Sequence, residues 1–128
     1  MNVLLDTHAL LWWMNDDPSL SMPARDVIAA EANTIYVSAA SAWEIAIKFK
    51  KGKLPTATYL LPDFSSLVEA EGFVNLPISA EHMIYSVQLP GEHRDPFDRI
   101  IAAQAILESM QLISIDAAMT EFGAFVHW

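Results

Sequence analysis

Several residue types are missing or scarce, and each absence narrows the possible functions. The 128-residue chain has no cysteine, which excludes disulfides, thiolate metal sites and cysteine nucleophiles. No apolar run approaches the ~20 residues that a membrane-spanning helix needs. The segment Met1–Asp6 lacks the basic region and cleavage site of a signal peptide. A hydrophobic content of 53% and only 4 glycines argue against disorder. We expect one domain over residues 1–128, in the cytoplasm.

Basic residues are also scarce. The chain has 7 Lys and Arg against 16 Asp and Glu, and its formal net charge is −9. This balance is unfavourable for a protein that binds nucleic-acid phosphates, which usually requires a basic surface. Three explanations remain open: some acids bind cations, a basic partner covers part of the surface, or the charge only keeps the protein soluble.

The order of apolar runs and capping residues predicts strands that alternate with helices. Such alternation indicates a mainly parallel sheet covered by helices on both faces, an α/β/α sandwich. The predicted strands are Val3–Leu5, Thr34–Val37, Phe73–Leu76 and Leu112–Ile115, with a possible fifth at Phe125–Val126. The predicted helices are His8–Met14, Met22–Ala32, Ala39–Lys51, Phe64–Glu71, a helix after Ser79 to Leu89, Phe97–Met110 and Ala117–Glu121.

Acidic residues recur where such a sheet binds ligands, beyond the carboxyl ends of its strands. Asp6 directly follows the first predicted strand, and Asp116 follows the fourth. Glu44 lies in the helix after the second strand. Asp98 lies in the first turn of the helix before the fourth strand, and that helix reaches the same edge only if the chain returns there. These carboxylates are therefore candidates for one shared pocket.

Each acid also has a local structural explanation. Asp6 and Asp116 could cap helices, and Asp98 sits where a carboxylate favours the helix dipole. Glu44 could form a capping box with Ser41 or pair with Lys48 four residues on. Asp95, ahead of Pro96, is a better helix cap than ligand.

Carboxylates that share a pocket need a compensating positive charge. Carboxylate oxygens suit the hard cations Mg²⁺ and Mn²⁺, and the lack of clustered His or Cys argues against zinc. A cation held this way can acidify water and stabilise charge on a phosphoryl oxygen. The pattern therefore favours metal-assisted phosphoryl chemistry.

Few basic residues are available to contact phosphates. Arg94 and Arg99 flank the proposed acids and are candidates for phosphate contacts, or for ion pairs with neighbouring acids. The basic cluster Lys48–Lys53 could contact RNA or only solvate a helix end. The tryptophans Trp12, Trp13 and Trp43 are expected in the core. The apolar surface around Leu10–Trp13, with Trp43, is also a candidate partner or dimer face.

Four sequence blocks resemble the PIN-domain toxins of the VapC type, in the order in which they occur in that family. The first is Asp6-Thr7-His8-Ala9-Leu10-Leu11-Trp12 and the second is Ser38–Lys48 followed by Gly52-Lys53-Leu54. The third is Asp95–Ala105 and the fourth is Leu112–Asp116. Together the blocks cover nearly the whole chain.

The resemblance implies a PIN-like fold and Mg²⁺- or Mn²⁺-dependent cleavage of RNA by activated water. It assigns the catalytic and metal-binding acids to Asp6, Glu44, Asp98 and Asp116. It further implies a cognate antitoxin that blocks the site, and a homodimer. Possible substrate contacts or supporting residues are Thr7, Asp95, Arg94, Arg99 and Ser114.

One departure from the family pattern concerns the fourth block. Many relatives carry Thr-Arg-Asp there, whereas this chain has Ser114-Ile115-Asp116, so the hydroxyl is kept and the arginine is replaced. The substrate contact that this arginine could make in those relatives is therefore absent here, whereas the acid Asp116 is kept.

Two other functions are weighed against the nuclease. A catalytically silent PIN-fold protein that binds a protein or RNA would be favoured by a missing core acid, and none of the four is missing. A haloacid-dehalogenase-like phosphatase requires a second Asp two residues after Asp6, and His8 occupies that position.

Overall fold

The computed structural model describes residues 1–54, 59–91 and 95–128. Its centre is a five-stranded sheet in the order β3-β2-β1-β4-β5, and every neighbouring pair is parallel. The strands are β1 (Asn2–Leu5), β2 (Thr34–Ser38), β3 (Val74–Leu76), β4 (Gln111–Ile113) and β5 (Val126–His127). The predicted parallel sheet is confirmed, and the possible fifth strand is present.

Seven helices are described around the sheet. They are α1 (Thr7–Met14), α2 (Met22–Ala29), α3 (Ala39–Lys50), α4 (Phe64–Ala70), α5 (Ala80–Gln88), α6 (Pro96–Leu107) and α7 (Ala117–Glu121). Most begin at a side-chain cap named in the sequence: Asp6 for α1, Ser21 for α2, Ser79 for α5, Asp95 for α6 and Asp116 for α7. Gly52, just beyond α3, has φ +75°, a conformation that glycine adopts without strain.

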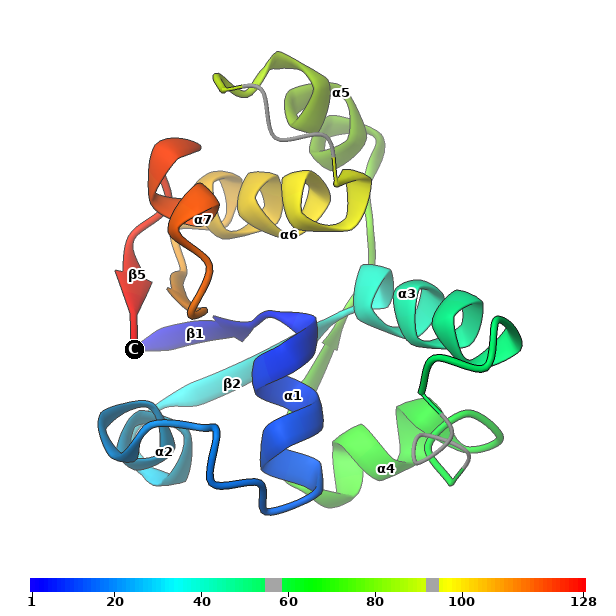
Figure 1. Ribbon diagram of the computed structural model, residues 1–128. Helices are drawn as coiled ribbons and strands as arrows, with labels where there is room; N and C mark the ends of the chain where they lie inside the picture. Colours follow the sequence, from blue (N-terminus) through cyan, green and yellow to red (C-terminus); the bar gives the residue numbers. More distant parts are fainter. Residues whose placement is uncertain (55–58, 92–94) are drawn as a thin grey trace.

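Alternating side chains of the central strand β1 divide the core into two layers. Val3 and Leu5 face a cluster that includes residues of α1, α2 and α4, whereas Leu4 faces a cluster built mainly from α6 and α7. Figure 1 shows α1, α2 and α4 on one face of the sheet and α6 and α7 on the other, with α5 stacked on the outer side of α6. The three-layer sandwich is therefore confirmed, and α5 lies outside it.

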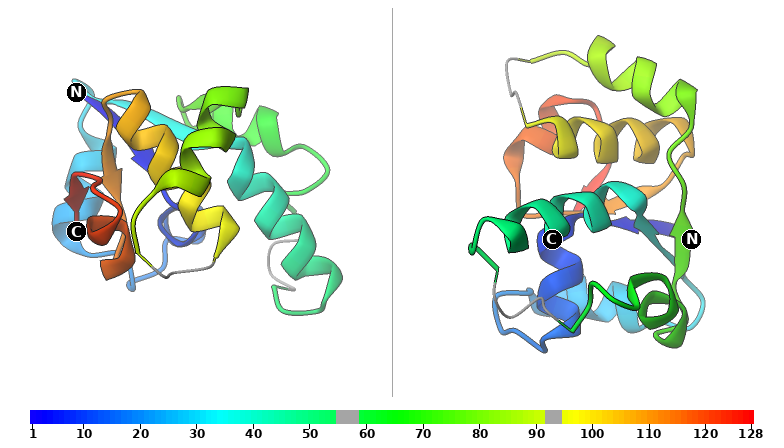
Figure 2. Two further views of the ribbon diagram at one scale, coloured as in Figure 1. Left: turned by 90° about the horizontal axis from the view of Figure 1, so that it is seen from above. Right: turned by 90° about the vertical axis from the view of Figure 1, so that its right-hand side faces the viewer.

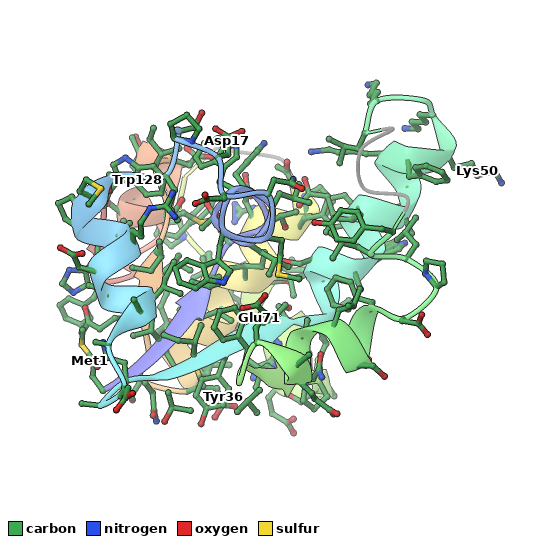
Figure 3. All side chains as sticks on the ribbon, turned by 90° about the horizontal axis from the view of Figure 1, so that it is seen from below. Met1, Asp17, Tyr36, Lys50, Glu71 and Trp128 are labelled. Carbon is green, nitrogen blue, oxygen red and sulfur yellow. The ribbon has the colours of Figure 1, made fainter. Side chains whose placement is uncertain are left out.

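Helix α3 runs outward from the sheet edge. Its first residues follow β2, and its far end extends beyond the rest of the molecule in both views of Figure 2. In Figure 3, Lys50 marks this projecting end, well away from Trp128 on the opposite side. Among the described residues, no helix is long and apolar enough to cross a membrane.

Candidate functional site

Asp6 lies at the junction between β1 and α1, where it is both a helix cap and a buried acid. Its Oδ1 accepts a hydrogen bond of 2.8 Å from the Ala9 N–H, and only 4% of the residue is exposed. Burial raises the pKa of the Asp6 carboxyl, although hydrogen bonds from the Ser114 side chain and the Ala9 N–H oppose the shift. The nearby charge of His8 also lowers this pKa, and the charge of Glu44, the smallest of these effects, raises it. Asp6 and Glu44 are therefore close enough to interact electrostatically.

Glu44 supplies the second buried carboxylate, from α3. It is 3% exposed, and its Oε2 accepts a hydrogen bond of 2.5 Å from Lys48 Nζ one helical turn later. The other oxygen, Oε1, is buried without a hydrogen-bond partner among the described residues. A buried carboxylate oxygen with no partner is costly, because it has given up its water without compensation. Of the two local explanations for Glu44, the structure shows the Lys48 pair; Ser38, not Ser41, caps α3.

A buried hydroxyl pair holds these two acids near each other. Thr7 Oγ1 and Ser41 Oγ lie 2.9 Å apart, and both residues are buried. Thr7 follows Asp6 directly, and Ser41 lies one helical turn before Glu44, so the pair fixes the start of α1 against the first turn of α3. The sequence predicted Thr7 as a supporting residue but not its hydrogen bond with Ser41.

Ser114 connects the carboxyl ends of β1 and β4. It is 1% exposed, its side chain bonds Asp6, and its Oγ accepts a hydrogen bond of 3.0 Å from the Asp116 N–H. Asp116 caps α7 through a 2.9 Å bond from the Ala118 N–H to Oδ1. The backbone of Asp116 is thus joined to Asp6 through a shared serine, whereas the Asp116 carboxylate caps α7.

Asp98 lies in the first turn of α6. Because α6 ends just before β4 begins, its first turn lies toward the opposite, carboxyl edge of the sheet, so the chain does return there. The rings of Trp43 and Phe97, 4.9 Å apart, place this turn against α3 beside Glu44. Asp95 caps α6, and its Oδ1 accepts from the Phe97 and Asp98 N–H groups at 2.9 and 3.2 Å.

The four predicted acids thus share one edge of the sheet but are not equally close. Asp6 is within electrostatic range of Glu44, the Asp116 backbone bonds Ser114, whose side chain also bonds Asp6, and the turn that carries Asp98 packs on α3. Within the described ranges, no three His, Cys, Asp or Glu side chains are close enough to hold a metal ion together.

The donor set nevertheless fits a hard divalent cation. Two buried carboxylates carry like charges that interact unfavourably, and one of their oxygens lacks a partner in the part of the chain that the structure describes. Oxygen ligands of this kind match Mg²⁺ or Mn²⁺. A dication bound there would reduce the repulsion between the two carboxylates and would give the unpartnered oxygen a ligand.

The basic candidates have different surroundings. Arg99 donates hydrogen bonds to the carbonyls of Leu89 and Gly91 at 3.0–3.2 Å, and its guanidinium lies 5.0 Å from the Phe122 ring. These contacts fix the connection between α5 and α6. Arg94 lies outside the described residues. The side chains of Lys50, Lys51 and Lys53 are exposed at the end of α3.

Two expectations about apolar side chains are wrong in part. Leu10 and Leu11 are core residues, 0% and 8% exposed, so they cannot form a partner face. Trp43, expected in the core, is 51% exposed, with its ring in edge-on contact with Phe97 of α6. Trp12 and Trp13 are half-buried; Trp12 packs against Trp128, with ring centroids 5.6 Å apart.

The PIN domain family model matches residues 3–124 of this chain. This chain belongs to the PIN-domain family. It is 31% identical over 116 residues to Ribonuclease VapC22 of Mycobacterium tuberculosis, which covers 89% of this chain and 86% of the relative. The resemblance to VapC-type PIN proteins in the sequence is therefore confirmed.

Solved structures share the fold at lower identity. VapBC2 from Rickettsia felis, bound to a DNA fragment from its promoter, gives a TM-score of 0.72 at 21% identity and covers 99% of this chain and 98% of the other. VapBC-1 from nontypeable Haemophilus influenzae gives 0.65 at 16% identity, with 99% and 97% covered. FitAcB from Neisseria gonorrhoeae gives 0.60 at 19% identity, with 98% and 96% covered. The PIN fold of this chain is thus shown independently of its sequence blocks.

Proposed function

We propose that this protein is a Mg²⁺- or Mn²⁺-dependent endoribonuclease and the toxin of a toxin–antitoxin pair. The observation that carries the proposal is the buried pair Asp6 and Glu44 at the carboxyl edge of the sheet, with one carboxylate oxygen unpartnered. The similarity to a VapC ribonuclease supports RNA as the substrate. The proposal takes residues 1–128 as one PIN domain acting in the cytoplasm.

Asp6, Glu44, Asp98 and Asp116 are the residues that we expect to hold the metal. Carboxylate-bound Mg²⁺ or Mn²⁺ supplies Lewis acidity, which polarises a phosphoryl oxygen and acidifies water. The protein's own contribution is to hold the carboxylates in place. Ser114 bonds Asp6, and the Thr7–Ser41 pair joins the start of α1, next to Asp6, to the first turn of α3, which carries Glu44 further along.

Substrate contacts are expected along α3. Lys50 ends the helix that carries Glu44, and Lys51 and Lys53 follow it; all three are exposed, in a chain whose formal net charge is −9. A short basic surface leading to the site would bind the RNA backbone without reading its sequence. Arg94 remains a further candidate for phosphate contact.

A cognate antitoxin is the expected protein partner. The similar solved structures are toxin–antitoxin complexes by name or by description, including one from Klebsiella pneumoniae with a TM-score of 0.52. An antitoxin that covers the carboxyl edge would exclude RNA from the acids. A homodimer also remains a prediction.

A cleavage assay on a fluorogenic RNA tests the nuclease. We expect activity with Mg²⁺ or Mn²⁺, loss with EDTA and recovery when the metal is restored. Glu44→Gln, Asp98→Asn and Asp116→Asn should each lower the rate, whereas Asp26→Asn, at an exposed position in α2, should not. Equal cleavage by the parent and all three site variants would disprove the assigned site. A pure, folded protein that binds RNA but never cuts it would favour the silent binding module.

A further inference from the structure

The contact between Lys48 and Glu44 places a cation of the protein itself on the proposed metal ligand. Lys48 Nζ lies 2.5 Å from Glu44 Oε2; the Lys48 side chain is 34% exposed and the Glu44 side chain 4%. The ammonium therefore lies between a buried carboxylate and solvent. Both residues belong to α3 and are four positions apart, so the pair forms without any other element.

The burial of Glu44 explains why a counter-ion is needed there. A buried carboxylate without a positive partner is strongly unfavourable, and the neighbouring charge of Asp6 adds repulsion. Lys48 neutralises Glu44 in the metal-free protein and orients its Oε2. Only Oε1 is then left without a partner among the described residues.

We propose that Lys48 is a positioning residue for Glu44 that also competes with the divalent cation for its carboxylate. This inference rests on the proposed function, since it takes Glu44 as a metal ligand. A dication at Glu44 would repel the adjacent ammonium, so Lys48 must turn toward solvent as the metal binds. Its side chain can do so because it is already partly exposed and flexible. Lys48 thus stabilises the metal-free protein and lowers its affinity for metal.

Calorimetric titration of the full chain with Mn²⁺ tests this competition. We expect Lys48→Met to bind Mn²⁺ about two- to fivefold more tightly than the parent, the range set by removal of one partly exposed ion pair. In EDTA the Tm of Lys48→Met should be lower than that of the parent. Saturating Mn²⁺ should raise the Tm of Lys48→Met by more than it raises the Tm of the parent. Lys48→Gln, which keeps a donor for Glu44 but not the charge, should show the same direction and serves if Lys48→Met does not fold.

Arg25→Met is the matched control. Arg25 forms an ion pair of 2.9 Å with Asp16, whose side chain is 90% exposed, so this variant removes one cation from a surface carboxylate. Its Mn²⁺ affinity should equal that of the parent. A purely structural role for Lys48 predicts weaker or unchanged Mn²⁺ binding in the Lys48 variants. Either result would overturn this inference but not the proposed function. If the parent binds no Mn²⁺, or if Glu44→Gln binds it equally well, the proposed function is also overturned.

Discussion

Two buried polar clusters in this protein differ in how completely they are satisfied. The first cluster, around His82, joins α5 and α6 to the end of β2. His82 Nδ1 accepts from the Ser79 N–H at 3.0 Å, so Nε2 carries the proton and donates to Glu108 Oε1 at 2.9 Å. Ser38 Oγ donates to Gln104 Oε1 at 2.6 Å, and Gln104 donates in turn to a backbone carbonyl.

The second cluster is the candidate site around Asp6 and Glu44. Here burial raises the pKa of Asp6, like charges face each other, and Glu44 Oε1 has no partner. In the described part of the chain, this oxygen is the one buried side-chain polar atom without a hydrogen bond. The His82 cluster therefore stabilises the fold as it stands, whereas the Asp6–Glu44 cluster leaves one buried oxygen without a partner among the described residues. We infer that polar groups left unsatisfied in a core mark function better than polar groups that are merely buried.

The largest effect should follow from neutralising Asp6. Asp6→Asn removes a proposed metal ligand but keeps a good helix cap, so the fold should persist. We expect RNA cleavage to fall by at least about 100-fold, as loss of even indirect metal support can cost 10- to 100-fold. Steady-state cleavage assays measure this, with Asp26→Asn as the control. Cleavage at the parent rate would show that the two clusters do not differ in function.

Breaking the His82 cluster should lower stability and leave metal binding unchanged, whereas Asp6→Asn should lower cleavage and leave the fold intact. Gln104→Met should lower the free energy of unfolding by about 1–3 kcal/mol, since the Ser38 hydroxyl loses its acceptor and the Pro77 carbonyl loses its donor. Urea unfolding measures the decrease, and Gln88→Met, at an exposed position on α5, is the control. Mn²⁺ affinity of the folded variant should match the parent. Weaker metal binding at unchanged stability would assign the His82 cluster to the site instead.

Lys50, Lys51 and Lys53 form a third set of charged groups, which differs from the two buried clusters because it is exposed to solvent. Replacing Lys50, Lys51 and Lys53 by Gln should weaken RNA binding and reduce its dependence on salt. The logarithmic slope should fall by about 0.7 for each phosphate that the variant no longer neutralises. Fluorescence anisotropy at several salt concentrations measures the slope. An unchanged slope would mean that these lysines only solvate the end of α3.

The smallest predicted effect concerns stability and pH in metal-free protein. Asp6 has a raised pKa when folded, so below its unfolded pKa of 3.8 it is protonated in both states and costs nothing. As pH rises above this value, Asp6 ionises more readily in the unfolded chain than in the folded protein. The free energy of unfolding of the parent therefore falls until the pH exceeds the folded pKa. The Tm of Asp6→Asn in EDTA should therefore exceed that of the parent by a few degrees at neutral pH, and the gap should close toward pH 3. A gap that widens as pH falls would contradict the burial of an ionised Asp6.

Local features of the sequence predicted most of the fold. Apolar runs located the strands, and capping residues such as Ser79 and Asp95 located the helix starts to within one or two residues, because these signals depend on neighbouring residues only. The same reasoning placed Asp6 and Asp116 after strands. Helix ends were less accurate: α2 and α6 each end three residues earlier than predicted.

What could not be predicted depends on contacts between distant residues. The Thr7–Ser41 and Ser38–Gln104 bonds join positions 34 and 66 residues apart, and no local pattern specifies them. The exposure of Trp43 and the burial of Leu10 likewise depend on how α3 and α1 are placed against their neighbours. The role of Arg99 in holding three backbone carbonyls required the path of the α5–α6 connection.

Crystals soaked in Mn²⁺ and measured near the manganese absorption edge test most directly whether the buried acids form a metal site. We predict an anomalous peak between the carboxylates of Asp6 and Glu44, and no peak there in crystals of Asp6→Asn. Well-ordered crystals of the parent with manganese bound elsewhere, or with no peak at these two side chains, would contradict the assignment.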